Sequence, residues 1–170
     1  MAALAAMEGI MFREMRRKDK LVDKNTGIEL LKSCNYGILS VLGDDDYPYG
    51  LPINYAYKDG FIYMHGFVDG HKLDAIAKHP KVCFTVVGDT EVLKKEVSTN
   101  FISVVAFGKA EVLLPPENEA RQEAFVIIMD RFVPNEKERT TAYIKENEAE
   151  ASVIKIKIEH MTCKESVKRP

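Results

Sequence analysis

The chain has 170 residues, 46% of them hydrophobic, and a formal net charge of −2, which favours one domain with a hydrophobic core. A near-neutral chain has no bulk electrostatic basis for binding nucleic acid, and no apolar run approaches the roughly 18 residues of a membrane helix. Residues 1–10 lack the basic start and long apolar run of a signal peptide, so we predict an N-terminal extension on a cytoplasmic protein. The predicted single domain covers residues 11–164, and residues 165–170 are a tail.

The domain begins with a basic segment, in which Arg16 is accompanied by further arginines and lysines. Two interpretations stay open: a solvated arm, or an arm in which one arginine reaches a bound phosphate, for which the planar guanidinium is well suited. A helix is predicted over residues 27–33, because Thr26 and Glu29 have capping-box spacing. A strand over residues 36–42 follows, with a turn over residues 43–46.

Residues 47–57 alternate with period two, which predicts one strand with a bulky face and a nearly bare face. Asp59-Gly60 then predicts a two-residue hairpin turn, because these residues adopt the positive φ angles that a type I′ turn requires. Continued along both strands, this register places Asn54 directly opposite His65 on the bare face. Such a flat face can receive a planar heterocycle, although a solvent-facing side of a sheet would show the same pattern.

A short helix is predicted next, with Asp69 as its N-cap and its end just before Pro80. Gly70, His71 and Lys72 then lie in the first turn, where free N–H groups and the helix dipole form an anion site. A lysine is electrostatically unfavourable at this end of a helix unless an anion neutralises it. The alternative is an ordinary solvated lysine.

The remaining histidines and cysteines do not indicate a metal site, because their spacings complete no usual zinc pattern. The three cysteines lack C-x-x-C spacing and are predicted to be reduced thiols. The rest of the chain is predicted from periodicity as a strand over 81–87, a loop over 88–100, a strand over 101–114 with a bulge at Gly108, helices over 117–132 and 136–147, and a strand over 151–159.

Four segments together resemble a known family: MRRKDK, GDDDYPYGLPINYAY, HGFVDGHKLDAIAKHPKVCFTV and FISVVAFGKAEVL. They resemble the flavin-binding split-barrel proteins related to pyridoxamine 5′-phosphate oxidase, and within that group the 5-nitroimidazole antibiotic resistance proteins. The resemblance implies a mainly β fold, a six-stranded antiparallel split β-barrel with peripheral helices. It also implies an FMN cofactor and a homodimer with two FMN sites at its interface.

The resemblance also suggests which residues form the site. His71 is the candidate catalytic residue, because an imidazole beside the flavin could donate a proton. Related proteins carry Thr-Gly-Lys near the C-terminus where this chain has Thr162-Cys163-Lys164, which weakens the case for a tight backbone contact there. The candidate cofactor-binding residues are Pro52, Ile53, Asn54, His65, Gly70, His71, Lys72, Ser103, Arg16 and Lys164.

The expected function is FMN-dependent reduction of nitro-aromatic compounds such as 5-nitroimidazoles, because the flavin itself carries the redox chemistry. Pyridoxamine 5′-phosphate oxidation is one alternative. It would need a further cluster of Arg and Lys for the substrate phosphate, and the family's arginine-rich C-terminal motif is not evident. Non-catalytic binding of flavin or haem is the other alternative, and a deazaflavin in place of FMN also stays open.

Overall fold

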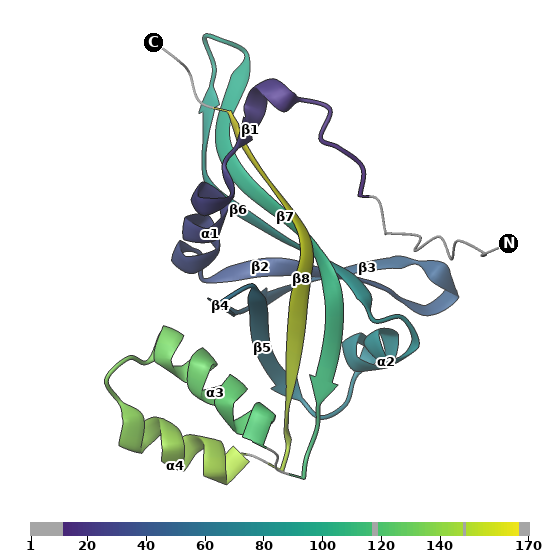
Figure 1. The fold of residues 1–170 in the computed structure, drawn as a ribbon, viewed down its shortest axis with the longest axis vertical. Coiled ribbons are helices and arrows are strands. Elements are labelled where there is room, and N and C mark those ends of the chain that lie inside the picture. Colours follow the sequence, from purple (N-terminus) through teal and green to yellow (C-terminus); the bar gives the residue numbers. More distant parts are fainter. Residues whose placement is uncertain (1–11, 117–118, 148, 167–170) are drawn as a thin grey trace, which may run out of the picture.

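The computed structural model describes residues 12–116, 119–147 and 149–166. It contains one antiparallel sheet with the strand order β3-β2-β6-β7-β8-β5-β4, and the short strand β1 pairs with β8. Figure 1 shows the sheet as a strongly curved surface with α1, α2 and the α3–α4 pair around it. The helices and strands are η1 Lys18–Lys20, β1 Leu21–Val22, α1 Lys24–Ser33, β2 Tyr36–Leu42, η2 Asp44–Asp46, β3 Pro48–Asn54, β4 Ala56–Lys58, β5 Phe61–Phe67, α2 His71–Lys78, β6 Lys81–Leu93, β7 Ser98–Leu113, α3 Glu119–Phe132, α4 Lys137–Asn147 and β8 Ala151–Ser166.

The predicted fold class is confirmed. The strands β2, β3, β5, β6, β7 and β8 have seven or more residues each, and they correspond to the six strands expected. The strands β1 and β4 are additional pieces of two and three residues. The pairing order ends at β3 and β4, so the sheet is a split barrel whose two edges are not hydrogen-bonded to each other.

The inner side of the sheet forms the main core. Alternation along β2 and β6 turns Leu39 and Phe84 inward, and both are fully buried. On β7 the inward residue is Val104, and its neighbour Val105 lies on the outward side. A second cluster forms on the outward side, where α3 packs over β4 and β5 and buries Ala56, Tyr63 and Phe125.

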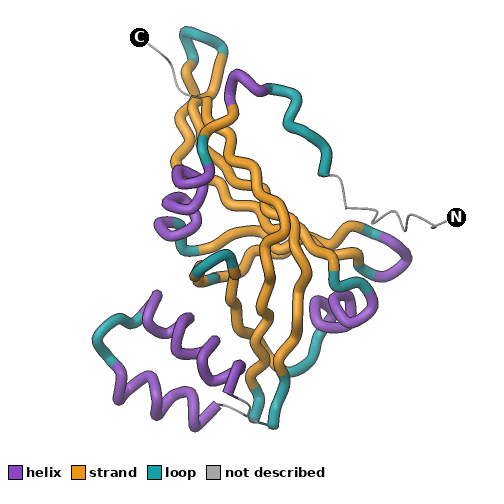
Figure 2. Tube along the Cα trace, viewed as in Figure 1, coloured by secondary structure: helices purple, strands orange, loops and turns teal. Residues whose placement is uncertain are grey.

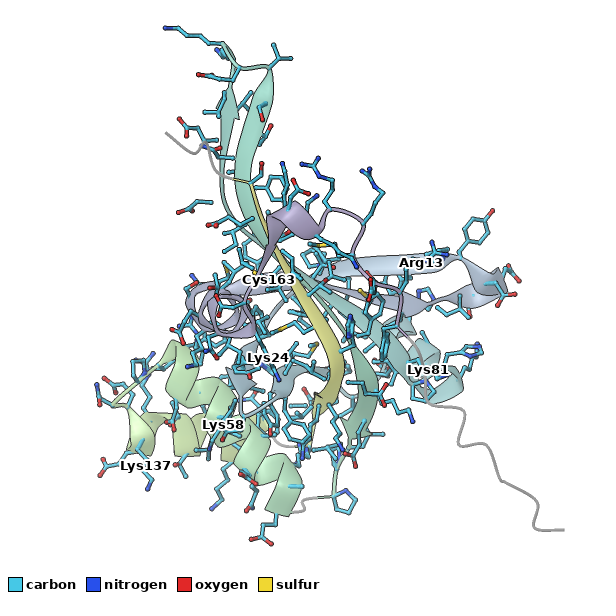
Figure 3. All side chains as sticks on the ribbon, turned by 45° about the horizontal axis from the view of Figure 1, so that its top comes forward. Arg13, Lys24, Lys58, Lys81, Lys137 and Cys163 are labelled. Atoms are coloured by element: carbon cyan, nitrogen blue, oxygen red, sulfur yellow. The ribbon has the colours of Figure 1, made fainter. Side chains whose placement is uncertain are left out.

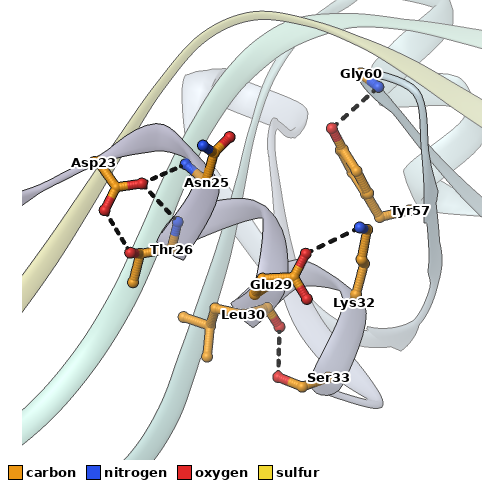
Figure 4. A network of polar contacts seen from close by, with 9 residues as sticks. All are labelled: Asp23, Asn25, Thr26, Glu29, Leu30, Lys32, Ser33, Tyr57 and Gly60. Carbon is orange, nitrogen blue, oxygen red and sulfur yellow. Dashed lines mark hydrogen bonds and ion pairs between the residues drawn. The ribbon is translucent and has the colours of Figure 1, made fainter.

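Helix α1 closes the inner side at one end. Its N-cap is Asp23, whose carboxylate accepts hydrogen bonds from the backbone N–H groups of Asn25 and Thr26 at 2.9 and 3.1 Å (Figure 4). The predicted capping box at Thr26 is therefore wrong, and the helix begins three residues earlier, at Lys24. The helix packs on β8 at Cys163, which is labelled in Figure 3. A Cβ on Gly27 would lie 3.1 Å from the Cys163 Cβ.

The predicted strand over residues 47–57 is two strands, because the chain turns at Tyr55. The Tyr55 ring is fully buried against Phe84, with ring centroids 4.8 Å apart, and its hydroxyl donates a 2.8 Å hydrogen bond to the Leu31 carbonyl at the end of α1. Burial raises the pKa of Tyr55, so this hydroxyl stays protonated and remains a donor. The chain leaves β3 at Asn54 and begins β4 at Ala56.

The hairpin at Asp59-Gly60 is confirmed, with Lys58 opposite Phe61 and Ala56 opposite Tyr63. The further pairing of Asn54 with His65 is wrong, since Asn54 lies in β3 and pairs with Tyr36 of β2 instead.

The predicted loop over residues 88–100 is also wrong. Both β6 and β7 continue as a two-stranded ribbon beyond the rest of the sheet, seen at the top of Figure 2. A register shift between Val87 and Thr90 lets the ribbon change direction. The predicted bulge at Gly108 is confirmed by a register shift between Phe107 and Gly108 in the β7–β8 pairing. The final strand is longer than predicted, and Thr162 to Lys164 lie within it.

None of the described helices is long and apolar enough to cross a membrane. Within the same residues, no three His, Cys, Asp or Glu side chains are grouped as a metal site would require.

Candidate functional site

The two strands β3 and β5 approach each other across the open side of the barrel without forming a hydrogen-bonded pair. The first turn of α2 lies against both of them. His71 stacks on Tyr49 of β3, with centroids 4.4 Å apart and ring planes 12° apart. Lys72 extends over Gly66 of β5, where an added Cβ would lie 3.1 Å from the Lys72 Nζ. The elbow before α2 therefore joins the two strands that border the opening.

The helix begins one residue later than predicted. Gly70, and not Asp69, is the N-cap, with φ of 122° and ψ of 161°. This φ is strained for any residue with a side chain, which explains the glycine. The first helical hydrogen bonds run from the N–H groups of Leu73 and Asp74 to the Gly70 carbonyl. The N–H groups before them, at the start of the helix, therefore have no helical partners. Nothing lies within 4 Å of the position of a Gly70 Cβ, so the elbow is open to solvent on that side.

The Lys72 side chain is only partly exposed and, within the described residues, forms no ion pair. Partial burial of an unpaired ammonium at the positive end of a helix dipole is unfavourable unless an anion is bound. Asp44, in the turn between β2 and β3, contacts His71 and Lys78 and not Lys72. The geometry therefore fits a small anion such as a phosphate at this elbow.

His71 lies beside the turn between β2 and β3. Its Nε2 is 3.5 Å from the Asp44 carboxylate, which also pairs with Lys78 Nζ at 3.1 Å. The ammonium of Lys78, followed by the imidazole of His71, lowers the pKa of Asp44, so this carboxylate is ionised at neutral pH. A Cβ on Gly43 would come within 3.2 Å of the His71 Nε2. These contacts fix the imidazole at the rim of the elbow while its side chain remains 43% exposed.

Ser103 and Lys164 lie elsewhere in the chain. They are directly opposite each other on β7 and β8, and the Lys164 ammonium lies 5.1 Å from the ring centroid of Phe101. Helix α2 packs near Ala110, seven residues further along β7, which corresponds to about 23 Å at about 3.3 Å per residue. Arg16 is exposed on the segment before β1. One chain therefore does not bring these three residues to the elbow.

The outward side of the sheet is open between β3 and β7, where no described helix covers it. On β3 the side chain of Ile53 points inward and packs on the core. On the outward side of the sheet, the side chains of Ile38 and Phe107 are 37% and 39% exposed. Phe12 stacks at the border of this surface on His160, with centroids 4.7 Å apart. We call this surface the outer face; by strand register it consists of Pro52, Ile38, Ser40, Cys83, Thr85, Val105 and Phe107.

Asn54 and His65 do not pair across strands, but both line a pocket of about 370 Å³ beside the α3–α4 pair. We call it the α3–α4 pocket. Burial lowers the pKa of His65, which therefore stays neutral near pH 7. Asn54 Nδ2 donates a 2.9 Å hydrogen bond to the Asn35 carbonyl. The other lining residues are Ile128, Met129, Phe132, Val133, Arg139, Thr140 and Tyr143.

Sequence reasoning missed the helical residues of this pocket. The usable signal was their spacing, because residues three and four apart share one helix face, and Tyr143 lies three residues after Thr140 and four after Arg139. The sequence could not say that this face meets the sheet at His65. The flat face predicted for a heterocycle is also partly covered, since α3 buries Ala56 and Tyr63.

Comparison with known proteins gives a family match. The profile of the family described as pyridoxamine 5′-phosphate oxidase matches residues 23–165. A search of curated proteins gives no match.

Solved structures share the fold at low identity. A candidate 5-nitroimidazole antibiotic resistance protein from Bacteroides thetaiotaomicron is 19% identical, with 85% of each chain covered and a TM-score of 0.69. A FAD-binding protein from Mesorhizobium loti is 20% identical, with 88% of this chain and 97% of that one covered and a TM-score of 0.65. A FAD and haem binding protein from Mycobacterium smegmatis is 19% identical, with coverages of 87% and 73% and a TM-score of 0.73.

Proposed function

Because the chain belongs to the pyridoxamine 5′-phosphate oxidase family, we propose that it binds FMN and acts as an oxidoreductase that reduces nitro-aromatic compounds. The observation that carries the cofactor proposal is the elbow at the start of α2. There an open glycine N-cap, N–H groups without helical partners and a Lys72 ammonium that pairs with no carboxylate of the described residues lie between β3 and β5. This combination suits the phosphate of a mononucleotide.

The two glycines of the elbow support the fit. Gly66 leaves room for the Lys72 ammonium, and Gly70 leaves the approach to the helix N-terminus open. Lys72 and the N–H groups would hold the phosphate, and the ring would lie along the opening bordered by β3 and β5. Bound FMN would supply hydride transfer, and the chain would bind it, orient it and provide protons.

His71 is the proposed proton donor. Reduction of a nitro group consumes protons as well as electrons, and a positioned imidazole typically contributes about 10²- to 10⁴-fold to such a step. Its stacking on Tyr49 and its contact with Asp44 hold the ring at the rim of the elbow, where a substrate beside the flavin could reach it. The structural relative that carries a nitroimidazole-resistance description supports this choice of substrate class.

A homodimer would complete the site. The outer face is partly apolar, and it includes exposed side chains of Ile38 and Phe107. If two copies pack through this face, Ser103 and Lys164 of the partner subunit could reach the FMN that the first chain holds at its elbow. This arrangement accounts for candidate site residues that lie about 23 Å from the elbow within one chain.

Binding of haem is a second candidate function, favoured by one observation. His65 is neutral and lies in a mainly apolar pocket, which is the state in which imidazole ligates a metal. The structural relative that binds both FAD and haem supports keeping this candidate.

The deciding experiment begins with the absorbance spectrum of the purified protein and the mass of any released chromophore. We expect flavin bands and a released mass equal to that of FMN; a deazaflavin mass or a haem Soret band would replace the cofactor proposal. The FMN-loaded protein is then reduced and mixed with a 5-nitroimidazole in a single turnover, with free reduced FMN as control. Reoxidation no faster than the control, or turnover of pyridoxamine 5′-phosphate instead, would refute the nitroreductase proposal.

A further inference from the structure

The α3–α4 pocket is built from three kinds of wall. The strands contribute Asn54 and His65, and α3 with its C-terminal extension contributes four apolar side chains from Ile128 to Val133. Helix α4 contributes Arg139, Thr140 and Tyr143. The volume of about 370 Å³ lies near the lower end of the roughly 300–1,000 Å³ range of ligand pockets. The pocket therefore suits a molecule of one or two rings.

The charge of the lining is one-sided. Among the described residues that line the pocket, Arg139 is the only permanently charged one and none is acidic. In the part of the chain that the structure describes, Arg139 forms no ion pair. A planar guanidinium with free N–H groups next to an apolar wall matches an anion attached to a ring, because a carboxylate can accept two parallel hydrogen bonds from it.

The polar groups of the strands add a second contact. His65 is neutral near pH 7, so it can donate or accept one hydrogen bond without adding charge. Its ring also contacts Phe125 of α3, with centroids 6.3 Å apart, which restricts its orientation. The Thr140 hydroxyl is already bonded to the carbonyls of Glu136 and Lys137, so it contributes shape more than a free donor.

We propose that the α3–α4 pocket is a binding site for a small aromatic carboxylate of one or two rings. The ring packs on the apolar residues of α3, the carboxylate pairs with Arg139, and a polar ring substituent contacts His65 or Asn54. As a binding site this stands on the pocket alone.

The test uses 2-naphthoate and its uncharged counterpart 2-naphthol as probes. The chain has no tryptophan, so the fluorescence of either probe can be followed against a low protein background. We expect saturable one-to-one binding of 2-naphthoate to the full chain, tighter than that of 2-naphthol. Arg139→Gln should weaken naphthoate binding by about tenfold; a larger loss is not expected, since Arg139 is exposed and its contact with the carboxylate is screened by solvent. Naphthol has no carboxylate, so its binding should not change.

The matched control is Lys137→Gln, which removes the same charge from the same helix at a residue that does not line the pocket. Val133→Phe fills the pocket and should abolish binding of both probes while the thermal transition remains cooperative. Equal losses of naphthoate affinity in Arg139→Gln and Lys137→Gln would overturn the proposal, as would unchanged binding in Val133→Phe. Absence of saturable binding to the folded wild type would overturn it as well.

The same titrations are run with and without FMN, whose own binding is followed by its visible absorbance. Naphthoate binding without any FMN binding would leave this site standing and refute the proposed flavin function. FMN binding without naphthoate binding would do the reverse. One-to-one haemin binding that depends on His65 and that naphthoate cannot displace would assign the pocket to a tetrapyrrole and overturn the inference.

Discussion

Replacing Lys72 by alanine is the most direct test of the elbow at the start of α2. The ammonium lies over Gly66 with no ion pair among the described residues, so the substitution removes no internal salt bridge and should leave the fold intact. A hydrogen bond to a charged group is worth about 1.5–3 kcal/mol, which corresponds to roughly a tenfold to hundredfold change in affinity. We therefore expect Lys72→Ala to weaken FMN binding by that factor.

The assay is a fluorescence titration of FMN into cofactor-free protein, because flavin emission changes when the ring is bound. Lys78→Ala is the matched control, since Lys78 lies in the last turn of the same helix and pairs with Asp44 instead of facing the elbow. Riboflavin, which lacks the phosphate, should bind wild type and Lys72→Ala equally well. The contact should also weaken as salt concentration rises.

Two results would refute the elbow as the phosphate site. One is a folded Lys72→Ala variant that binds FMN as tightly as wild type. The other is an equal loss of affinity for FMN and riboflavin, which would mean that Lys72 supports the ring or the local structure. Gly66→Ala gives an independent check, because its Cβ would displace the Lys72 ammonium and should weaken FMN binding while leaving the helix in place.

Three further predictions follow from the positions of single residues. Val105→Asp should give a folded monomer in sedimentation, with weakened binding in an FMN titration, because Val105 lies on the outer face. Val104→Asp should unfold the chain instead, because Val104 is fully buried. A Val105→Asp variant that stays dimeric and binds FMN normally would contradict the shared site. His71→Ala should slow oxidation of the reduced protein by a nitroimidazole at least about tenfold at saturating FMN, with the helix-end variant His79→Ala as control; a normal rate would exclude proton donation. Because burial lowers the pKa of His65, the unfolded chain binds more protons below about pH 6.5, so the free energy of unfolding should fall as pH falls through that range, and urea titrations of His65→Gln should lack this part of the decrease.

The sequence by itself determined the features that depend on neighbouring residues. The Asp59-Gly60 turn set the pairing of Ala56 with Tyr63, because a two-residue loop leaves only one register. Pro80 set the end of α2, and the alternation after residue 36 set β2 from Tyr36 to Leu42. These elements are decided by backbone geometry and side-chain period, which a short window of sequence contains.

Only the tertiary structure decided where the candidate residues meet. Tyr55 breaks a continuous alternating run because its hydroxyl finds the Leu31 carbonyl at the end of α1, a partner 24 residues away. Helix α3 covers Ala56, which alternation alone would leave as exposed as Asn54. On β7 the alternation does not say which face points inward, and only burial against the core distinguishes Val104 from Val105. Such choices depend on which distant surfaces exclude water together, and that information is not contained in any local stretch of the chain.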